Sequence, residues 1–172
     1  MSAMYSVWLM PDSASLARLQ PIHERLCRQF GTPRFDLHLT LLGGCALDLA
    51  RLKAILPAIV ENTPPFRADV IDIGTSATFF QSFYALFAAQ GPILMLKERT
   101  MRLALDQGVG AFMPHVSLLY GPVEAGAKAE AAAAARREAN GVSIRFDSVT
   151  LAYSSDTLPI ADWRIEARAP LR

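Results

Sequence analysis

The stretch of residues 35–43 alternates between apolar and polar side chains. Its apolar positions are Phe35, Leu37, Leu39 and Leu41. This period of two is typical of a β-strand with one buried face. His38 and Thr40 belong to the other face, so we expect them to point the same way, about 7 Å apart along the strand. Together they can bind one small polar group.

The same pattern returns in the second half of the chain. Residues 115–121 repeat residues 38–44: the His, two Leu and the final Gly are identical, while Val replaces Leu and Ser replaces Thr. The interval is 77 residues in a chain of 172. His115 and Ser117 therefore form a second pair. One His-x-Thr pattern carries little information, but two copies in opposite halves indicate a duplicated element.

The remaining hydrophobic pattern predicts further strands and helices. Besides the two histidine strands, the predicted strands are residues 5–10, 66–73, 79–87, 143–153 and 163–169. Helices are predicted through residues 16–30, 49–59, 92–105 and 122–135. Asp48 is expected to cap the second helix. Pro21 is expected to kink or split the first.

The repeat extends beyond the histidine strands. Aligning residues 66–73 with residues 144–151 pairs Arg with Arg and Asp with Asp. We therefore expect a single bilobal domain over residues 1–172, with similar halves of about 1–77 and 78–172 related by a pseudo-twofold axis. The two histidine strands would then face each other across one cleft.

Composition narrows the range of partners. A hydrophobic content of 52% is enough for a core, and a net charge of +1 provides no broad cationic field for a nucleic-acid duplex. A local pocket for one phosphate or nucleotide remains compatible with this charge. A monomer is expected.

Cysteine usage and hydropathy bear on the compartment. Cys27 and Cys45 are too few and too irregularly spaced for a disulfide framework or a zinc knuckle. The start of the chain has no basic region before a long apolar run, and nowhere do about 18 apolar residues run together. We therefore expect a cytoplasmic protein with no membrane partner.

Two imidazoles and two hydroxyls around one centre suit acid–base chemistry. The unperturbed pKa of histidine lies near 6.5, so a pair can hold one neutral base and one protonated acid. The hydroxyls of Thr40 and Ser117 can bind oxygens that carry negative charge. A substrate attacked by water on one side while an oxygen leaves on the other fits a phosphodiester better than an ester or an amide.

The two His-x-Thr/Ser motifs resemble those of the two-histidine phosphoesterase superfamily. Within it, residues 5–11 and 30–43 and the motif at His115 resemble the cyclic phosphodiesterase branch. The resemblance implies an α+β fold in which two antiparallel sheets form a central cleft with helices on the outside. It also implies hydrolysis of ADP-ribose 1″,2″-cyclic phosphate or nucleoside 2′,3′-cyclic phosphates, with no metal or other cofactor.

The resemblance further assigns roles to individual residues. His38 and His115 become the acid and the base, and Thr40 and Ser117 become the phosphate ligands. Tyr120 would contact the substrate. Its strand parity is opposite to that of His115, so this placement requires a twist or a bulge. The sequence does not indicate which histidine activates water.

Three other functions compete with this one. Asp36 shares a face with His38 and, together with His115, could complete a metal site. An RNA 2′,5′-phosphodiesterase or ligase of the same superfamily is the second alternative. The third is a module that binds a nucleotide without turnover.

Several other residues are ambiguous from sequence alone. His23 belongs to no repeated pattern, so we expect a surface or partly packed histidine outside the site. Trp8, Phe79, Phe80 and Tyr84 could stack a base. Packing in the core is the simpler interpretation of each.

Overall fold

The computed structural model describes residues 4–172 as four helices and eight strands, with two short 3-10 helices. The strands are β1 (Tyr5–Pro11), β2 (Leu39–Cys45), β3 (Phe66–Asp69), β4 (Asp72–Thr75), β5 (Phe83–Leu86), β6 (His115–Leu119), β7 (Ser143–Tyr153) and β8 (Arg164–Pro170). The helices are α1 (Ser13–Phe30), α2 (Leu49–Val60), α3 (Gly91–Leu105) and α4 (Ala125–Ala139), with η1 (Phe79–Gln81) and η2 (Ile160–Asp162). The predicted α+β class is confirmed.

All eight strands belong to one antiparallel sheet. Seven of them follow the order β3-β7-β1-β2-β6-β5-β4, and β8 pairs with β7 outside this order. The two predicted sheets are therefore the two parts of a single sheet. They join where β2 meets β6, through the pair Leu39 and Val116. These residues directly follow His38 and His115 in the chain. The junction thus brings the two histidine motifs side by side.

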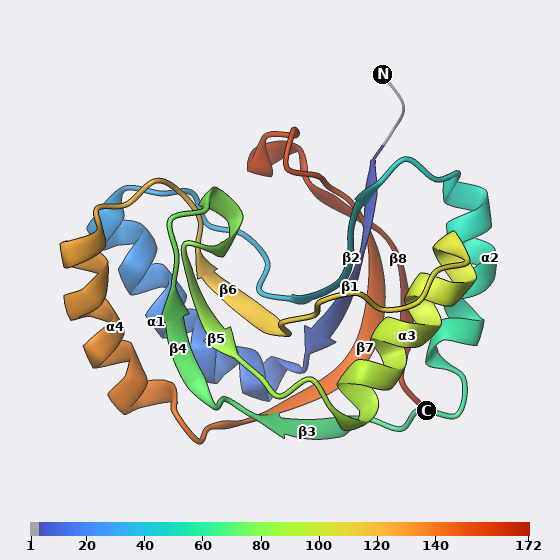
Figure 1. Cartoon of the computed structure of the whole chain (residues 1–172), viewed down its shortest axis with the longest axis horizontal. Helices are drawn as coiled ribbons and strands as arrows, with labels where there is room; N and C mark the ends of the chain where they lie inside the picture. The colour runs from blue at the N-terminus through green and yellow to red at the C-terminus, as the bar shows by residue number, and fades with distance from the viewer. Residues whose placement is uncertain (1–3) are drawn as a thin grey trace.

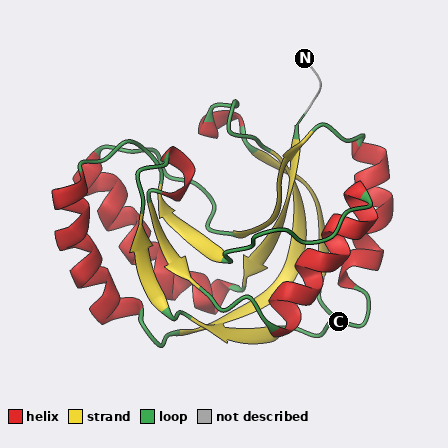
Figure 2. Ribbon diagram, viewed as in Figure 1, coloured by secondary structure: helices red, strands yellow, loops and turns green. Residues whose placement is uncertain are grey.

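The helices cover the outside of the curved sheet in two pairs (Figures 1 and 2). Helices α1 and α4 contact each other. Helix α1 packs on β6, whereas α4 packs on β4 and β5. Helices α2 and α3 form the other pair, in which α3 packs on β2. The first helix of each half therefore packs on the histidine strand of the other half: α1 packs on β6, and α3 packs on β2. The order strand, helix, strand, helix, strand occurs twice, although the boundaries of the repeat stay a prediction.

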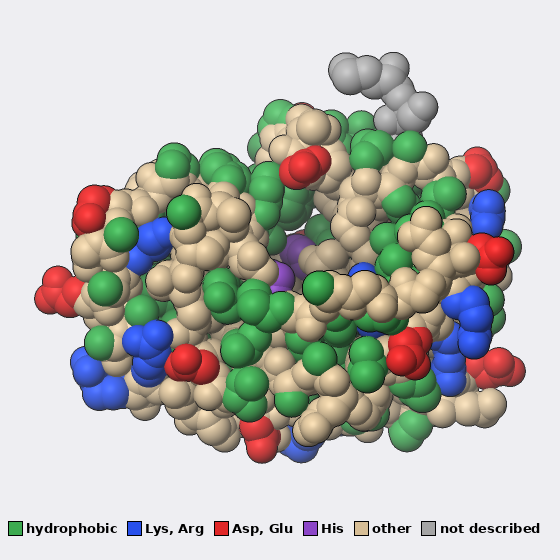
Figure 3. All heavy atoms as spheres, in the orientation of Figure 1, with side chains coloured by type: hydrophobic (Ala, Val, Ile, Leu, Met, Phe, Trp, Pro, Cys, Tyr) green, Lys and Arg blue, Asp and Glu red, His purple; other side chains and the backbone are tan. Residues whose placement is uncertain are grey.

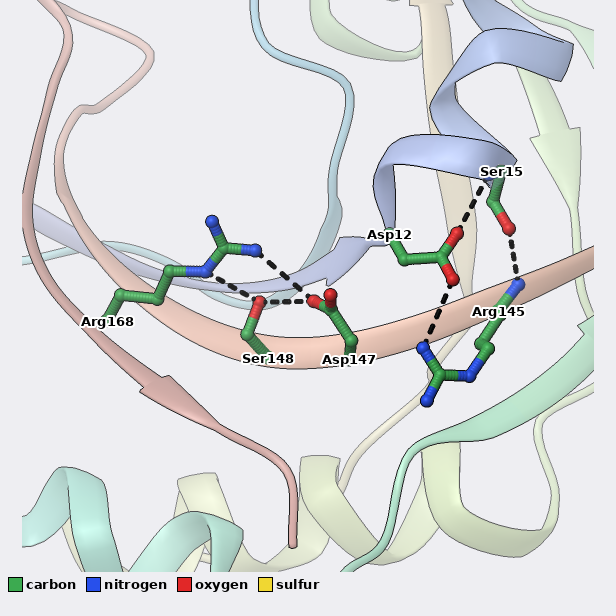
Figure 4. Close-up of polar contacts among 6 residues, drawn as sticks. All are labelled: Asp12, Ser15, Arg145, Asp147, Ser148 and Arg168. Carbon is green, nitrogen blue, oxygen red and sulfur yellow. Dashed lines mark hydrogen bonds and ion pairs between the residues drawn. The ribbon is translucent and has the colours of Figure 1, made fainter.

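Helix α1 begins where the sequence offers a cap. The Asp12 carboxylate accepts a hydrogen bond from the Ser15 amide at 2.8 Å and from the Arg145 guanidinium at 3.1 Å. The Ser15 hydroxyl accepts from the Arg145 amide at 2.7 Å, which fixes the helix start on β7 (Figure 4). Arg168 of β8 binds the adjacent Asp147 and Ser148 in the same view. The apolar stripe of α1 is thereby aimed at the core.

Pro21 does not split this helix. Helix α1 runs without interruption over 18 residues, so that part of the prediction is wrong. Pro21 is exposed, while Leu19 and Ile22 beside it are buried in the core. Packing of the apolar stripe holds the helix together across the missing backbone donor.

The prediction of one strand over residues 66–73 is also wrong. The segment forms β3, which pairs with β7, and β4, which pairs with β5 at the other end of the sheet order. Between them the Val70 amide donates to Val142 O and the Ile71 amide donates to Leu86 O, at 3.0 and 2.9 Å. The chain thus changes partner strands without losing backbone hydrogen bonds.

The predicted strand over residues 79–87 begins later than expected. Its first residues form η1, and β5 starts at Phe83. The Ser76 hydroxyl donates to Gln81 O at 2.7 Å and accepts from the Thr78 amide at 3.2 Å. These bonds curl the segment before it can pair. Phe79 and Phe80 therefore belong to η1 and not to the paired strand.

A single apolar core fills the space between the sheet and the helices. A smaller cluster of Trp8, Met10 and Ala152, with Trp163 packed against it, is separate from that core. Across residues 4–172, no helix is long and apolar enough to cross a membrane.

Candidate active site

The structure brings all five predicted site residues to one cavity of about 550 Å³. Its lining includes His38, Thr40, His115, Ser117 and Tyr120. Figure 3 shows histidine side chains inside a hollow of the surface, with hydrophobic side chains along its rim. The cavity lies over the junction of β2 and β6, which is why both motifs reach it.

His38 is buried and held on two sides. Its Nδ1 lies 2.6 Å from Asp36 O, and its ring stacks on Trp8 with centroids 3.8 Å apart and planes at 13°. A carbonyl oxygen can only accept, so Nδ1 carries the hydrogen and Nε2 is the nitrogen left for chemistry. Burial, with a smaller contribution from the charge of His115, lowers the pKa of His38 to about 4, against the opposing effect of the Asp36 carbonyl.

His115 is held in the same way. Its Nδ1 donates to Met113 O at 2.8 Å, again the carbonyl two residues earlier. It is only partly buried, and it meets the Tyr84 ring edge-on at 5.3 Å. Burial lowers its pKa from the ordinary value, with the Met113 carbonyl opposing the shift. Both imidazoles thus leave Nε2 available for chemistry, but His38 is the more shielded.

The two hydroxyls differ in their surroundings. Thr40 is partly exposed at the cavity. Ser117 is buried, and its hydroxyl donates to Phe80 O at 3.1 Å. A hydroxyl has one hydrogen, so Ser117 must release this bond before it can donate to a substrate oxygen.

Tyr120 reaches the cavity through an irregularity of strand β6. Phe83 of β5 pairs with Leu119 and Tyr84 pairs with Ser117, so Leu118 is one extra residue on β6 and the parity of the strand changes before Tyr120. The twist or bulge that this placement requires is therefore present. Its ring stacks on Phe35 at 3.8 Å and meets Phe80 edge-on at 5.1 Å. Burial raises the pKa of the phenol, opposed by a hydrogen bond with Ser117, so the group stays a neutral donor.

Sequence analysis missed Trp163 and a polar corner of the cavity. The Trp163 ring lies 5.8 Å from Trp8 and 6.1 Å from Phe80. In the corner, the Ser6 hydroxyl donates to Ser154 O at 3.2 Å and accepts from the Gly44 amide at 2.9 Å. Ser6 and Trp8 alternate with Val7 on β1, a signal that could have placed both on the cavity face. Trp163 required knowledge of how β8 pairs.

The prediction that His23 is a surface or partly packed residue is wrong. His23 is fully buried. Its Nδ1 donates to Leu118 O at 2.9 Å, and its Nε2 accepts from the Phe35 amide at 3.3 Å. Burial lowers its pKa, and this pair of bonds requires the neutral ring. His23 therefore links the segments of both motifs from behind the cavity. Its helical position gave no sign of these tertiary partners.

The carboxylate proposed for a metal site lies elsewhere. Asp36 is exposed and lines a different cavity, together with Arg34 and Arg164. Within residues 4–172, no group of three or more His, Cys, Asp or Glu side chains is placed to hold a metal ion.

The geometry agrees with comparisons to known proteins. The protein-family model of the 2′-5′ RNA ligase superfamily matches residues 10–157. The chain belongs to this superfamily. The resemblance to two-histidine phosphoesterases drawn from the paired motifs is thereby confirmed.

Relatives within the superfamily include a cyclic phosphodiesterase of Arabidopsis thaliana. The two chains are 28% identical over 117 residues, which cover 68% of this chain and 65% of that protein. TT0787 of Thermus thermophilus has a similar fold, with a TM-score of 0.66, 18% identity and 98% of each chain covered. The E. coli LigT structure complexed with 3′-AMP gives a TM-score of 0.56 and 18% identity over 99% of each chain.

Proposed function

We propose that this protein is a metal-independent cyclic nucleotide phosphodiesterase. Its substrates would be nucleoside 2′,3′-cyclic phosphates, ADP-ribose 1″,2″-cyclic phosphate, or both. The observation that carries the proposal is the matched pair of imidazoles in one cavity, each with Nδ1 fixed by the carbonyl two residues earlier. The cyclic phosphodiesterase of Arabidopsis supports this choice of reaction.

In the proposed reaction, His38 and His115 divide the acid and base roles. The neutral imidazole removes a proton from water, whose oxygen forms a new bond to phosphorus. The protonated imidazole gives its proton to the ester oxygen as that P–O bond breaks and the ring opens. Thr40 and Ser117 donate to the non-bridging oxygens. Each positioned proton transfer contributes about 10²- to 10⁴-fold.

The substrate's own charge assists in supplying the proton. Both histidine pKa values lie below the ordinary value in the free protein, so both rings are largely neutral at pH 7. A phosphate anion between them favours the protonated form of one ring. The anion of the substrate thus stabilises the acid that the reaction requires.

The test combines product analysis with two single substitutions. We expect 2′,3′-cyclic nucleotides to give one phosphomonoester each, identified by phosphorus NMR. His38→Ala and His115→Ala should each lower kcat by at least about 10²-fold. His23 is unsuitable as a control because it holds the site together, so an exposed position such as Lys53→Ala serves. Loss of activity on chelation would instead indicate a metal hydrolase.

Action on RNA 2′,5′ linkages is the second candidate, and the family description favours it. Comparing a cyclic mononucleotide with an oligonucleotide that carries the same terminus separates the two functions. A strong preference for the oligonucleotide would overturn the first proposal. Nucleotide binding without turnover in the wild-type protein would identify a binding module.

A further inference from the structure

A second cavity of about 650 Å³ adjoins the histidine cavity and shares Phe79, Phe80 and Asp156 with it. Its remaining lining is Pro33, Thr157, Leu158, Pro159, Ile160 and Ala161. It lies between η1 and the connection from β7 to β8, which projects over the open side of the sheet (Figure 1). A substrate whose phosphate occupies the first cavity can therefore extend into the second.

The lining of the second cavity suits a flat ring. Phe79 is 45% exposed, an unusual state for so large an apolar side chain, and its ring lies 4.7 Å from that of Phe80. Phe80 in turn lies parallel to Trp163 within 22°. Exposed aromatic faces bind nucleobases by stacking.

The charge of the two cavities is unusual for a nucleotide site. Among the described residues that line them there is no Lys or Arg, and Asp156 is the one carboxylate. Added phosphates would therefore meet no cation and would meet a negative charge. A base with hydrogen-bond donors, in contrast, would find an acceptor in Asp156.

The backbone of the loop around Asp156 is held in place, while Asp156 itself is exposed. The Ser155 hydroxyl accepts from the Thr157 amide at 3.2 Å, and the two hydroxyls lie 3.0 Å apart. On the other side Gly44 approaches closely: a Cβ there would lie 3.2 Å from the Ser155 Cβ. These contacts fix the backbone on both sides of Asp156 between the two cavities.

We propose that the second cavity binds the nucleobase and that Asp156 selects guanine, which makes guanosine 2′,3′-cyclic phosphate the preferred substrate. Guanine presents two adjacent N–H donors, at N1 and N2, to a carboxylate that has two acceptor oxygens. Adenine and cytosine offer one amino group beside an acceptor, and uracil offers one N–H between two carbonyls. This inference rests on the proposed function, because the phosphate must occupy the histidine cavity.

The experiment measures kcat/KM for the 2′,3′-cyclic phosphates of guanosine, inosine, adenosine, cytidine and uridine. We expect guanosine to exceed adenosine and uridine by about 10- to 100-fold, as expected for hydrogen bonds to a charged group. Inosine, which lacks the N2 amino group, should fall between. Asp156→Asn should reduce the ratio of guanosine to uridine to within about threefold. Asp162→Asn removes a charge from the same connection outside both cavities and should keep the ratio.

Equilibrium binding separates failure of this inference from failure of the proposed function. Calorimetry with guanosine and adenosine 2′-monophosphates measures base selection without turnover. Hydrolysis of all five nucleotides at similar kcat/KM, or equal effects of Asp156→Asn on all, would overturn the inference and leave the phosphodiesterase intact. Guanine-selective binding that depends on Asp156, with no hydrolysis, would support the inference and overturn the enzyme.

Discussion

At the scale of single residues, the backbone sets the chemistry of both histidines. Asp36 O and Met113 O take the Nδ1 hydrogens, so each ring presents Nε2 for the reaction. No charged side chain is needed to orient either ring. The protonation of each ring then depends mainly on burial and, in the proposed reaction, on a bound anion. This dependence can be measured from the effect of pH on the rate.

The pH dependence of kcat/KM should peak on the acidic side. In the proposed reaction the productive state has one neutral and one protonated histidine, and kcat/KM reports the free protein. The pKa of His38 is about 4, and that of His115 lies below 6.5. We therefore expect a bell with its maximum between about 4 and 6.5. The bound anion raises both pKa values, so the kcat optimum should lie higher, between about 5.5 and 7.5. Initial rates across pH check this, and a steady rise with pH would contradict it.

At the scale of elements, helix α4 supports the segment that carries Phe79 and Phe80. Lys128 is 4% exposed, and its Nζ donates to Ser76 O at 2.6 Å and lies 3.4 Å from the Ser82 hydroxyl. The buried Lys128 amine thus joins the helix to both ends of the segment 76–82. Lys128 does not itself line either cavity, so we expect it to affect substrate binding only by positioning this segment.

Lys128→Met should lower the free energy of unfolding by about 1–3 kcal/mol, because it leaves buried acceptors unpaired. It should also raise KM more than it lowers kcat, since the segment with Phe79 and Phe80 loosens while the histidines keep their carbonyl partners. Urea unfolding and steady-state kinetics measure the two effects. The matched control is Lys53→Met on the exposed face of α2. An equal KM for both variants would contradict the positioning role.

The sequence was most informative where the local pattern carries the chemistry. Period-two alternation around His38 and a second copy at His115 were sufficient to predict one shared site. The sequence did not predict features that depend on tertiary partners. Residues 66–73 divide between two strands that pair with distant parts of the sheet. The partners of His23 are Leu118 and Phe35, which its own helix does not reveal. Asp156 and Trp163 belong to a connection with no motif, so only the pairing of β7 and β8 reveals them.

At the scale of the whole molecule, three histidines that are held neutral make stability depend on pH. The pKa values of His23, His38 and His115 are all lowered on folding. The unfolded chain therefore binds more protons below about pH 6.5, and stability falls as pH drops from there. For His38, with a folded pKa of about 4, the loss approaches about 3 kcal/mol by pH 4.

Urea unfolding at intervals between pH 7.5 and about 4.5 tests this dependence, a window that lies above the ordinary pKa of the carboxylates. We expect the free energy of unfolding to decline over that window in the wild-type protein. His38→Gln should decline less steeply, because one proton-linked group is removed. A flat profile in the wild-type protein would show that these rings are not held neutral.

The pairing of Leu39 with Val116 has a mechanical consequence. Each of these residues directly follows one of the two histidines proposed to be catalytic, and the pair is the point at which the two parts of the sheet meet. Because each ring is one residue from this pair, a shift in the pairing of β2 with β6 would change the distance between the two rings. The spacing that the proposed reaction requires between the two rings thus depends on the same backbone pair that joins the two parts of the sheet.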